Sequence, residues 1–237
     1  MPLPPLLAEL AGSPGEAAVL LDVDGTLAPI VLDPEDSRVP EETRAELRRL
    51  VGRYALVGCV TGRPSSVAQE IVGVDGIVYA GEHGLELDPE AEAWIPPLDE
   101  LVAAAPWPAE RKRFTASFHY RTAEDEEAAA AVLSGLADRA RKAGLVARWG
   151  RKVLEVRPPV DAHKGTALVH LLESRGLRRA LFAGDDDTDL DGFGAMDELE
   201  LGVKIAVASD EAPPALREAA DLVVDGPAGL LELLRLL

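Results

Sequence analysis

Two hydrophobic patterns alternate along the first part of the chain. Short apolar runs predict buried strands, whereas apolar residues that recur every three or four positions predict helices packed against them. In chain order these patterns predict a strand over 19–22, a helix over 40–53, a strand over 54–63, a helix over 64–72 and a strand over 76–81. An alternation of this kind implies parallel strands joined by right-handed crossovers.

The pattern changes after the third strand. Alternating apolar and polar positions now replace the continuous apolar runs, which is typical of antiparallel strands with one solvated face. In chain order we expect a hairpin over 84–95, a strand over 111–121, a helix over 123–142 and strands over 145–150 and 151–158. This order predicts a smaller α+β unit.

Strand–helix alternation returns at about residue 161. The expected elements are a helix over 163–175, a strand over 179–186, a helix from 188, a strand over 203–208, a helix near Pro213, a strand over 221–225 and a final helix. We therefore predict an α/β fold. Its parts are a Rossmann-like, doubly wound parallel core, residues 1–84 and 161–237, and an inserted α+β cap domain, residues 85–160.

The composition limits the classes of partner. With 47% apolar residues and a formal net charge of −18, the chain is predicted to be globular and to bind neither nucleic acid nor an anionic membrane. No apolar run reaches the roughly 18 residues that a membrane span needs. Cys59 is the single cysteine, which excludes an internal disulfide and a cysteine-rich zinc site, and its apolar neighbours place it in the core. We expect a cytoplasmic monomer.

The charge is unevenly distributed along the chain. Residues 85–160 carry 13 acidic and 11 basic side chains, a net charge of −2, so most of the negative charge lies elsewhere. A middle segment relatively rich in cations is compatible with an anionic substrate. It is equally compatible with a solvated surface of mixed sign.

Two acidic clusters follow two of the predicted core strands. Because the carboxyl ends of parallel strands meet at one edge of the sheet, where open α/β sheets bind their ligands, we expect these clusters to lie together. So many carboxylates repel one another unless cations neutralise them, and oxygen ligands without His or Cys favour Mg²⁺. The candidate metal ligands are Asp22, Asp24, Asp185, Asp186 and Asp189.

Carboxylate-held Mg²⁺ usually assists phosphate binding, so phosphate ligands are expected at the same edge. In "VTGRP" the Thr61 hydroxyl and the backbone N–H groups of Gly62 and Arg63 lie between a strand end and the start of a helix. In "HKGTAL" Lys164 begins a helix and supplies a compact positive charge. Taken alone, Lys164 is equally compatible with an ordinary surface position.

Four segments, "DVDGTL", "TGR", "HKGTAL" and "GDDDTD", resemble in this order the four motifs of the haloacid dehalogenase superfamily of phosphohydrolases. The resemblance implies that Asp22 is a nucleophile that forms an aspartyl-phosphate, and that Asp24 protonates the leaving oxygen and later activates water. It also implies that Thr61 and Lys164 bind the phosphoryl group. The implied Mg²⁺ ligands are Asp22, the backbone carbonyl of Asp24, and Asp185, with Asp186 and Asp189 behind them.

The segments "YAGEHGLEL", "KRFTASFHYR" and "GRKVLEVRP" extend the resemblance to trehalose-6-phosphate phosphatases, over about residues 20–207. That resemblance implies that a small sugar phosphate, trehalose 6-phosphate, is hydrolysed to trehalose and phosphate. The additional substrate-binding residues that it implies are His83, Lys112, His119, Arg121 and Glu155. The chain departs from this family at His163, where the family often has Asn, and in its short C-terminal tail.

Other functions stay open at this point. A phosphatase for another sugar phosphate, such as glucosylglycerol phosphate or sucrose phosphate, would share the core and differ in the cap. A phosphosugar mutase fits less well, because the cap segments do not resemble that family. A catalytically silent sugar-phosphate sensor would be expected to lack Asp22, Asp24 or Lys164, and all three are present.

Overall fold

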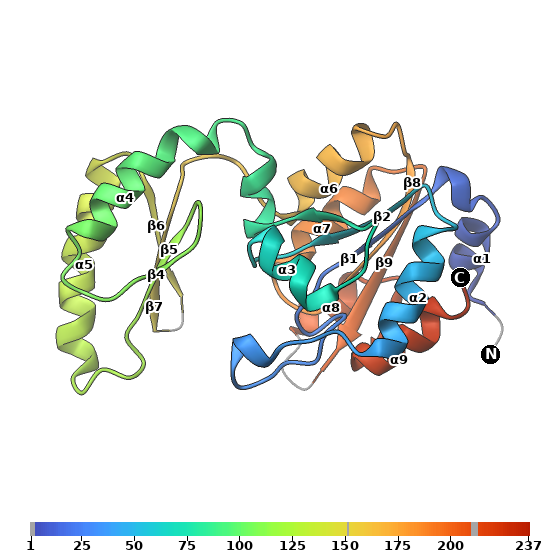
Figure 1. Cartoon of the computed structure of the whole chain (residues 1–237), viewed down its shortest axis with the longest axis horizontal. Coiled ribbons are helices and arrows are strands. Elements are labelled where there is room, and N and C mark those ends of the chain that lie inside the picture. The colour runs from blue at the N-terminus through green and yellow to red at the C-terminus, as the bar shows by residue number, and fades with distance from the viewer. Residues whose placement is uncertain (1–2, 151, 210–212) are drawn as a thin grey trace. The chain divides into compact units, whose positions relative to one another are not determined.

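The chain divides into two compact units in the computed structural model, which describes residues 3–150, 152–209 and 213–237. The first unit comprises Met1–Leu87 and Ala162–Leu237, and the second comprises Asp88–Asp161 (Figure 1). The predicted boundaries, after residues 84 and 160, differ from these by three residues and by one. Arg151, the first residue of a predicted strand, lies outside the described residues.

The first unit is built on a six-stranded sheet in the order β10-β9-β8-β1-β2-β3, in which all neighbouring strands are parallel. The strands are β1 (Ala18–Leu21), β2 (Leu56–Val60), β3 (Val78–Ala80), β8 (Arg179–Gly184), β9 (Leu201–Ala208) and β10 (Leu222–Asp225). After β1 the chain proceeds outward through β2 and β3, and it later returns to β8 on the other side of β1. The strand order therefore reverses between β1 and β8, where open α/β sheets bind ligands.

Helices cover both faces of this sheet (Figure 1). One face packs against α1 (Pro5–Ala11), α2 (Glu41–Val51), α3 (Ser65–Val72) and α9 (Gly226–Leu234), and the other against α6 (Lys164–Glu173), α7 (Asp189–Asp197) and α8 (Pro214–Ala219). Two short 3₁₀ helices, η1 (Pro14–Glu16) and η2 (Pro34–Asp36), lie in the connections. Cys59 is fully buried in the core, as predicted. None of the helices in the described ranges is long and apolar enough to cross a membrane.

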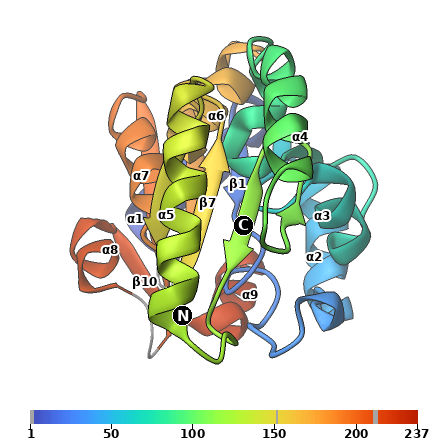
Figure 2. The ribbon, with the colours of Figure 1, turned by 90° about the vertical axis from the view of Figure 1, so that its left-hand side faces the viewer.

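The second unit contains a four-stranded antiparallel sheet in the order β4-β5-β7-β6. The strands are β4 (Glu110–Arg111), β5 (Ala116–His119), β6 (Val146–Gly150) and β7 (Val153–Arg157). Two helices, α4 (Ile95–Ala103) and α5 (Glu126–Lys142), cover one face of this sheet (Figure 2). Phe118 and Leu154 of the sheet are fully buried in the core of this unit. The predicted fold class, a doubly wound parallel core with an inserted α+β unit, is confirmed.

Two predictions within the connecting segments are wrong. Residues 84–95 form no hairpin: apart from a turn over 88–90, they belong to η3 (Glu82–Leu87), η4 (Ala91–Trp94) and the start of α4. The paired prolines after Ile95 fit the first turn of a helix, where their missing N–H groups need no partner. The predicted strand over 111–121 is instead the β4–β5 hairpin, whose turn is closed by a 2.9 Å hydrogen bond from the Lys112 N–H to the Thr115 carbonyl.

Candidate active site

Asp22 lies at the carboxyl end of the central strand β1. Its N–H donates to the Ala183 carbonyl at 2.9 Å, which extends the β1–β8 ladder to this residue, and its side chain is buried. The chain then turns sharply at Gly25, which has a φ of 79°. A Cβ atom on Gly25 would lie 2.0 Å from the carboxylate of Asp185, so only glycine allows the two strand ends to approach in this way.

Lys164, the first residue of α6, joins the two acidic clusters. Its Nζ donates to Asp22 at 2.9 Å and to Asp189 at 2.6 Å, and it lies 3.7 Å from Asp186. Only 2% of this side chain is exposed, which rules out the ordinary surface position. Lys164 therefore lies at the edge of the sheet where β1 ends.

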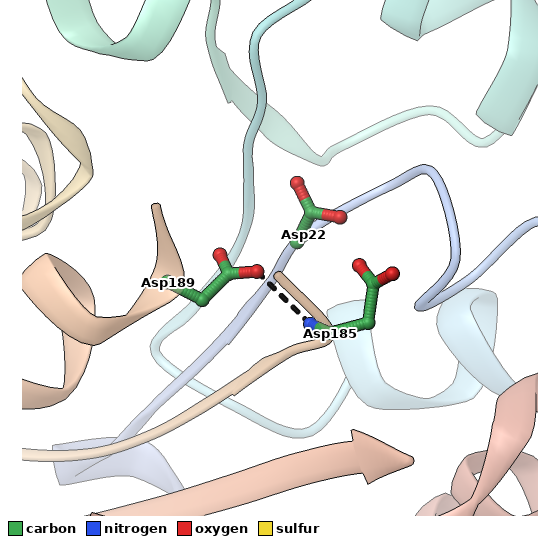
Figure 3. A group of neighbouring side chains, drawn as sticks. All are labelled: Asp22, Asp185 and Asp189. Carbon is green, nitrogen blue, oxygen red and sulfur yellow. Dashed lines mark hydrogen bonds between the residues drawn. The ribbon is translucent and has the colours of Figure 1, made fainter. Parts of the chain in front are cut away.

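Asp22, Asp185 and Asp189 form a compact carboxylate group (Figure 3). One oxygen from each lies within 4.8 Å of the other two, an arrangement that could hold a metal ion. Asp189 is held in place because its Oδ2 accepts from the N–H groups of Asp185 at 2.9 Å and Asp186 at 3.0 Å. The Thr26 hydroxyl donates to Asp185 at 3.3 Å.

The electrostatics of this group show an excess of negative charge. Burial raises the pKa of Asp22 to about 6, that of Asp185 to about 7 and that of Asp189 to about 8, and the neighbouring carboxylates add to each increase. Burial alone would lower the pKa of Lys164, but Asp22 and Asp189 outweigh it and hold that pKa above its ordinary value. One lysine does not neutralise three carboxylates, so the donor set fits a divalent cation.

The carboxylates of the other two predicted metal ligands have other hydrogen-bond partners. Asp24 is held by the guanidinium of Arg63 in two hydrogen bonds of 2.6 and 2.7 Å, and it also accepts from the Ser37 hydroxyl at 3.1 Å. Asp186 accepts from the N–H and hydroxyl of Thr188 at 2.8 and 2.6 Å. These two carboxylates therefore do not belong to the compact group of three.

Thr61 directly follows β2, the neighbour of β1 in the sheet, and its side chain is buried. The N–H of His83 donates to the Thr61 carbonyl, and that of Glu82 to the Arg63 carbonyl, both at 2.9 Å. A Cβ atom on Gly62 would lie 2.5 Å from Nε2 of His83, so the imidazole packs directly against the loop over 61–63. The structure thus brings Thr61, Gly62, Arg63 and His83 together at the edge that holds Asp22.

The remaining candidate residues lie in the second unit. Glu155 points away from the face packed against the helices, because its neighbours in β7 are buried there, and its register partners are Ser117 and Arg148. His119 is half exposed at the end of β5, and its Nε2 lies 3.0 Å from the carboxylate of Glu110. Lys112 lies in the β4–β5 turn, and Arg121 is exposed in the turn after β5.

The structure adds residues that the sequence analysis missed. Ser37 contacts Asp24 from 13 positions away in the chain, and Glu86 accepts from the N–H groups of Ser65 and Gly81, at 2.9 and 3.2 Å. Glu86 therefore fixes the entrance to α3 just after the Thr61 loop. Neither residue is part of a local pattern, so no sequence signal identifies them.

The sequence was also compared with protein families and with known proteins. A family model described as trehalose-phosphatase matches residues 20–107 and 108–227. The chain is 37% identical to the trehalose-phosphate phosphatase of Mycolicibacterium paratuberculosis over 76% of this chain and 51% of that protein. It is 30% identical to the trehalose 6-phosphate phosphatase RA3 of Zea mays, over 98% of this chain and 72% of that protein.

Among solved structures, the C-terminal domain of C. albicans trehalose-6-phosphate phosphatase matches with a TM-score of 0.72. The match covers 98% of this chain and 96% of that one at 22% identity, and it supports the fold. The chain spans about half to three fifths of the length of the first curated relatives that it matches.

The raised pKa values predict how stability depends on pH and on a divalent cation. Without a cation, the free energy of unfolding should fall between about pH 5 and pH 8. Carboxyls with folded pKa values of about 6, 7 and 8, against 3.8 for the ordinary carboxyl, bind more protons when folded, and raising the pH removes these protons. Thermal unfolding, measured with EDTA and with Mg²⁺, should show that Mg²⁺ stabilises the protein more at about pH 8 than at about pH 5.

Asp185→Asn is the control for this prediction. The amide does not titrate and is a poorer cation ligand, so the variant should show a flatter pH dependence in EDTA and a smaller response to Mg²⁺. A Mg²⁺ response of equal size at both pH values would contradict the assignment of a cation to this group.

Proposed function

The chain belongs to the trehalose-phosphatase family, and we propose that it hydrolyses trehalose 6-phosphate to trehalose and inorganic phosphate. One observation carries the phosphatase chemistry: Lys164 holds the buried carboxylate of Asp22 at the open end of β1, next to Asp185 and Asp189. Membership of the family supports the choice of sugar. A cytoplasmic monomer stays our prediction for the protein's state and location.

In the proposed reaction an Asp22 oxygen attacks the phosphorus, and the bond from phosphorus to the sugar oxygen breaks. The sugar oxygen takes a proton from Asp24, which leaves an aspartyl-phosphate on Asp22. A water molecule then attacks that phosphorus and gives a proton to Asp24, which releases phosphate and restores Asp22. Lys164, Thr61 and the N–H groups of the loop after Thr61 orient the phosphoryl group and offset its negative charge.

The residues that would hold Mg²⁺ are Asp22, Asp185 and Asp189, with the Asp24 carbonyl and Asp186 beside them. When bound, Mg²⁺ supplies positive charge that reduces the repulsion between a carboxylate nucleophile and a phosphate ester. The excess of buried carboxylates over lysines supports this choice of a hard divalent cation.

Arg63 is proposed to orient the proton-transfer residue. Its guanidinium binds Asp24 through two hydrogen bonds, and it donates a third, of 3.0 Å, to the Pro34 carbonyl. A planar fork of this kind fixes both the position and the rotation of a carboxylate. We therefore propose that Arg63 orients the Asp24 carboxylate, in addition to making the substrate contact expected from the sequence.

The second unit is proposed to act as a cap that reads the sugar. Every phosphate ester offers the same phosphoryl group to the first unit, so discrimination has to come from contacts with sugar hydroxyls. The sheet face that carries Glu155 is not covered by α4 and α5, and Lys112 lies in the turn at one end of the same sheet. Charged side chains form the stronger hydrogen bonds to hydroxyl groups.

Single-turnover kinetics should separate the two aspartates. With p-nitrophenyl phosphate, whose leaving group needs little protonation, Asp24→Asn should release about one equivalent of nitrophenolate and then stall, because water is not activated. Asp22→Asn should release none while its far-ultraviolet circular dichroism stays native. A burst from Asp22→Asn, or no burst from a folded Asp24→Asn, would contradict the covalent mechanism.

Specificity should depend on the second unit. Glu155→Ala and Lys112→Ala should each lower kcat/KM for trehalose 6-phosphate about ten- to a hundredfold and leave p-nitrophenyl phosphate nearly unaffected, because a lost polar contact to a hydroxyl is specific to the sugar. Glu127→Ala and Lys142→Ala, which remove the same charges from the exposed surface of α5, serve as controls.

Three other results of that experiment would be informative. If both substrates decline equally, Glu155 and Lys112 support the fold and do not read the sugar. If neither declines, the cap assignment is wrong. Faster turnover of sucrose phosphate or glucosylglycerol phosphate than of trehalose 6-phosphate would reassign the substrate.

A further inference from the structure

The position of Lys164 depends on how the first turn of α6 is held. Lys164 is the first residue of this helix, and its buried Nζ has to reach both Asp22 and Asp189. The first N–H groups of a helix have no partners within the helix, so the groups outside it decide where the first turn lies. A small displacement of that turn would displace the Lys164 backbone directly.

The residue before Lys164 supplies these partners. His163 has an extended backbone, and its Nδ1 accepts from the N–H of Gly165 at 3.1 Å and from that of Thr166 at 3.4 Å. In return, the Thr166 hydroxyl accepts from the His163 N–H at 3.0 Å and donates to the His163 carbonyl at 2.9 Å. The two side chains thus form a reciprocal capping box around Lys164.

A histidine can do this only in one protonation form. Because Nδ1 accepts two N–H donors, the ring has to carry its proton on Nε2. The carboxylate of Asp191, at the start of α7, lies 3.8 Å from Nδ1. Asparagine offers a side-chain oxygen that accepts the same bonds and is among the best residues at this position.

We infer that His163 is a positioning residue: its imidazole Nδ1 caps α6 and thereby aims Lys164 at Asp22 and at the phosphoryl group. The inference rests on the proposed function for its effect on turnover, whereas the capping geometry is independent of that function. His163 itself touches neither substrate nor metal in this assignment. Its replacement by a residue without an acceptor should therefore impair Lys164 while leaving every reacting group in the chain.

Three variants test the inference, each assayed with p-nitrophenyl phosphate and saturating Mg²⁺. His163→Ala should lower kcat about tenfold or more, the effect expected when a reacting group is misplaced by a fraction of an ångström to an ångström. His163→Asn should stay within about twofold of the parent protein, because Asn restores the acceptor. Should His163→Ala fail to fold, His163→Gly replaces it, since glycine lacks the acceptor but is tolerated at this position.

Asp125→Ala is the matched control. Asp125 caps α5 in the second unit by accepting from the Ala128 N–H at 2.9 Å, and α5 carries none of the proposed reacting groups. Its removal should lower the melting temperature about as much as His163→Ala does and leave kcat unchanged. A His163→Ala protein that melts earlier but turns over at the parent rate would show a purely structural cap and overturn the inference.

A second outcome would also overturn it. If His163→Asn is as slow as His163→Ala, the imidazole acts through something other than its acceptor.

Hydrogen exchange gives a readout that needs no activity: the N–H groups of Gly165 and Thr166 should exchange faster in His163→Ala than in His163→Asn. Inorganic phosphate, titrated calorimetrically, should bind His163→Ala more weakly than it binds His163→Asn.

These two readouts also separate the inference from the proposed function. If the parent protein releases phosphate from no ester, the proposed function fails, and faster exchange with weaker phosphate binding in His163→Ala still supports the positioning role. If the parent protein is active and His163→Ala matches it in exchange, phosphate binding and kcat, the inference alone is wrong.

Discussion

One buried lysine among several buried carboxylates is the constraint on which the rest of this structure depends. Lys164 and the two carboxylates that it contacts, Asp22 and Asp189, are almost inaccessible to solvent, and an uncompensated charge in such a place is costly. Asp189 begins α7, where the helix dipole favours a negative charge, but the dipole of α6 disfavours a lysine at its first residue. The ion pairs of Lys164 and the cap at His163 therefore hold this lysine in place despite the unfavourable dipole of α6.

The same constraint applies to the first unit, which carries the proposed reacting groups, and not to the second unit, which is proposed to select the substrate. The carboxylates and Lys164 tolerate little change, because each is buried and contacts the others. The sheet of the second unit has no such restriction: its buried face packs on α4 and α5, and residues such as Glu155 and Ser117 alternate to the other face. An antiparallel sheet with one solvated face can change those side chains without disturbing its core. With the proposed role of this unit as the part that reads the sugar, substrate choice can vary while the reaction persists.

Local patterns predicted the strands of the first unit and its helices other than α1 (Pro5–Ala11), and with them the strand ends beside Asp22, Thr61 and Asp185. What they could not predict depends on contacts between distant segments. The attachment of Asp24 to Arg63 and Ser37 joins three loops, and nothing in the pattern around any one of them indicates the others. The expected hairpin over 84–95 is wrong for a related reason. The segment alternates apolar and polar residues, but it pairs with no strand, and its prolines favour the start of a helix at residue 95.

The turn after β3 shows why the loop that follows Thr61 is rigid. Glu82 and His83 both have positive φ, 47° and 56°, a conformation that costs non-glycine residues about 1 kcal/mol or more each. Relaxing the turn would break the hydrogen bonds from their N–H groups to the Arg63 and Thr61 carbonyls. The Thr61 carbonyl directly follows β2, which is buried along its whole length, and an unpaired polar group there costs at least as much. The unfavourable backbone is therefore retained. It holds in place the loop over 61–63, whose N–H groups are proposed to orient the phosphoryl group.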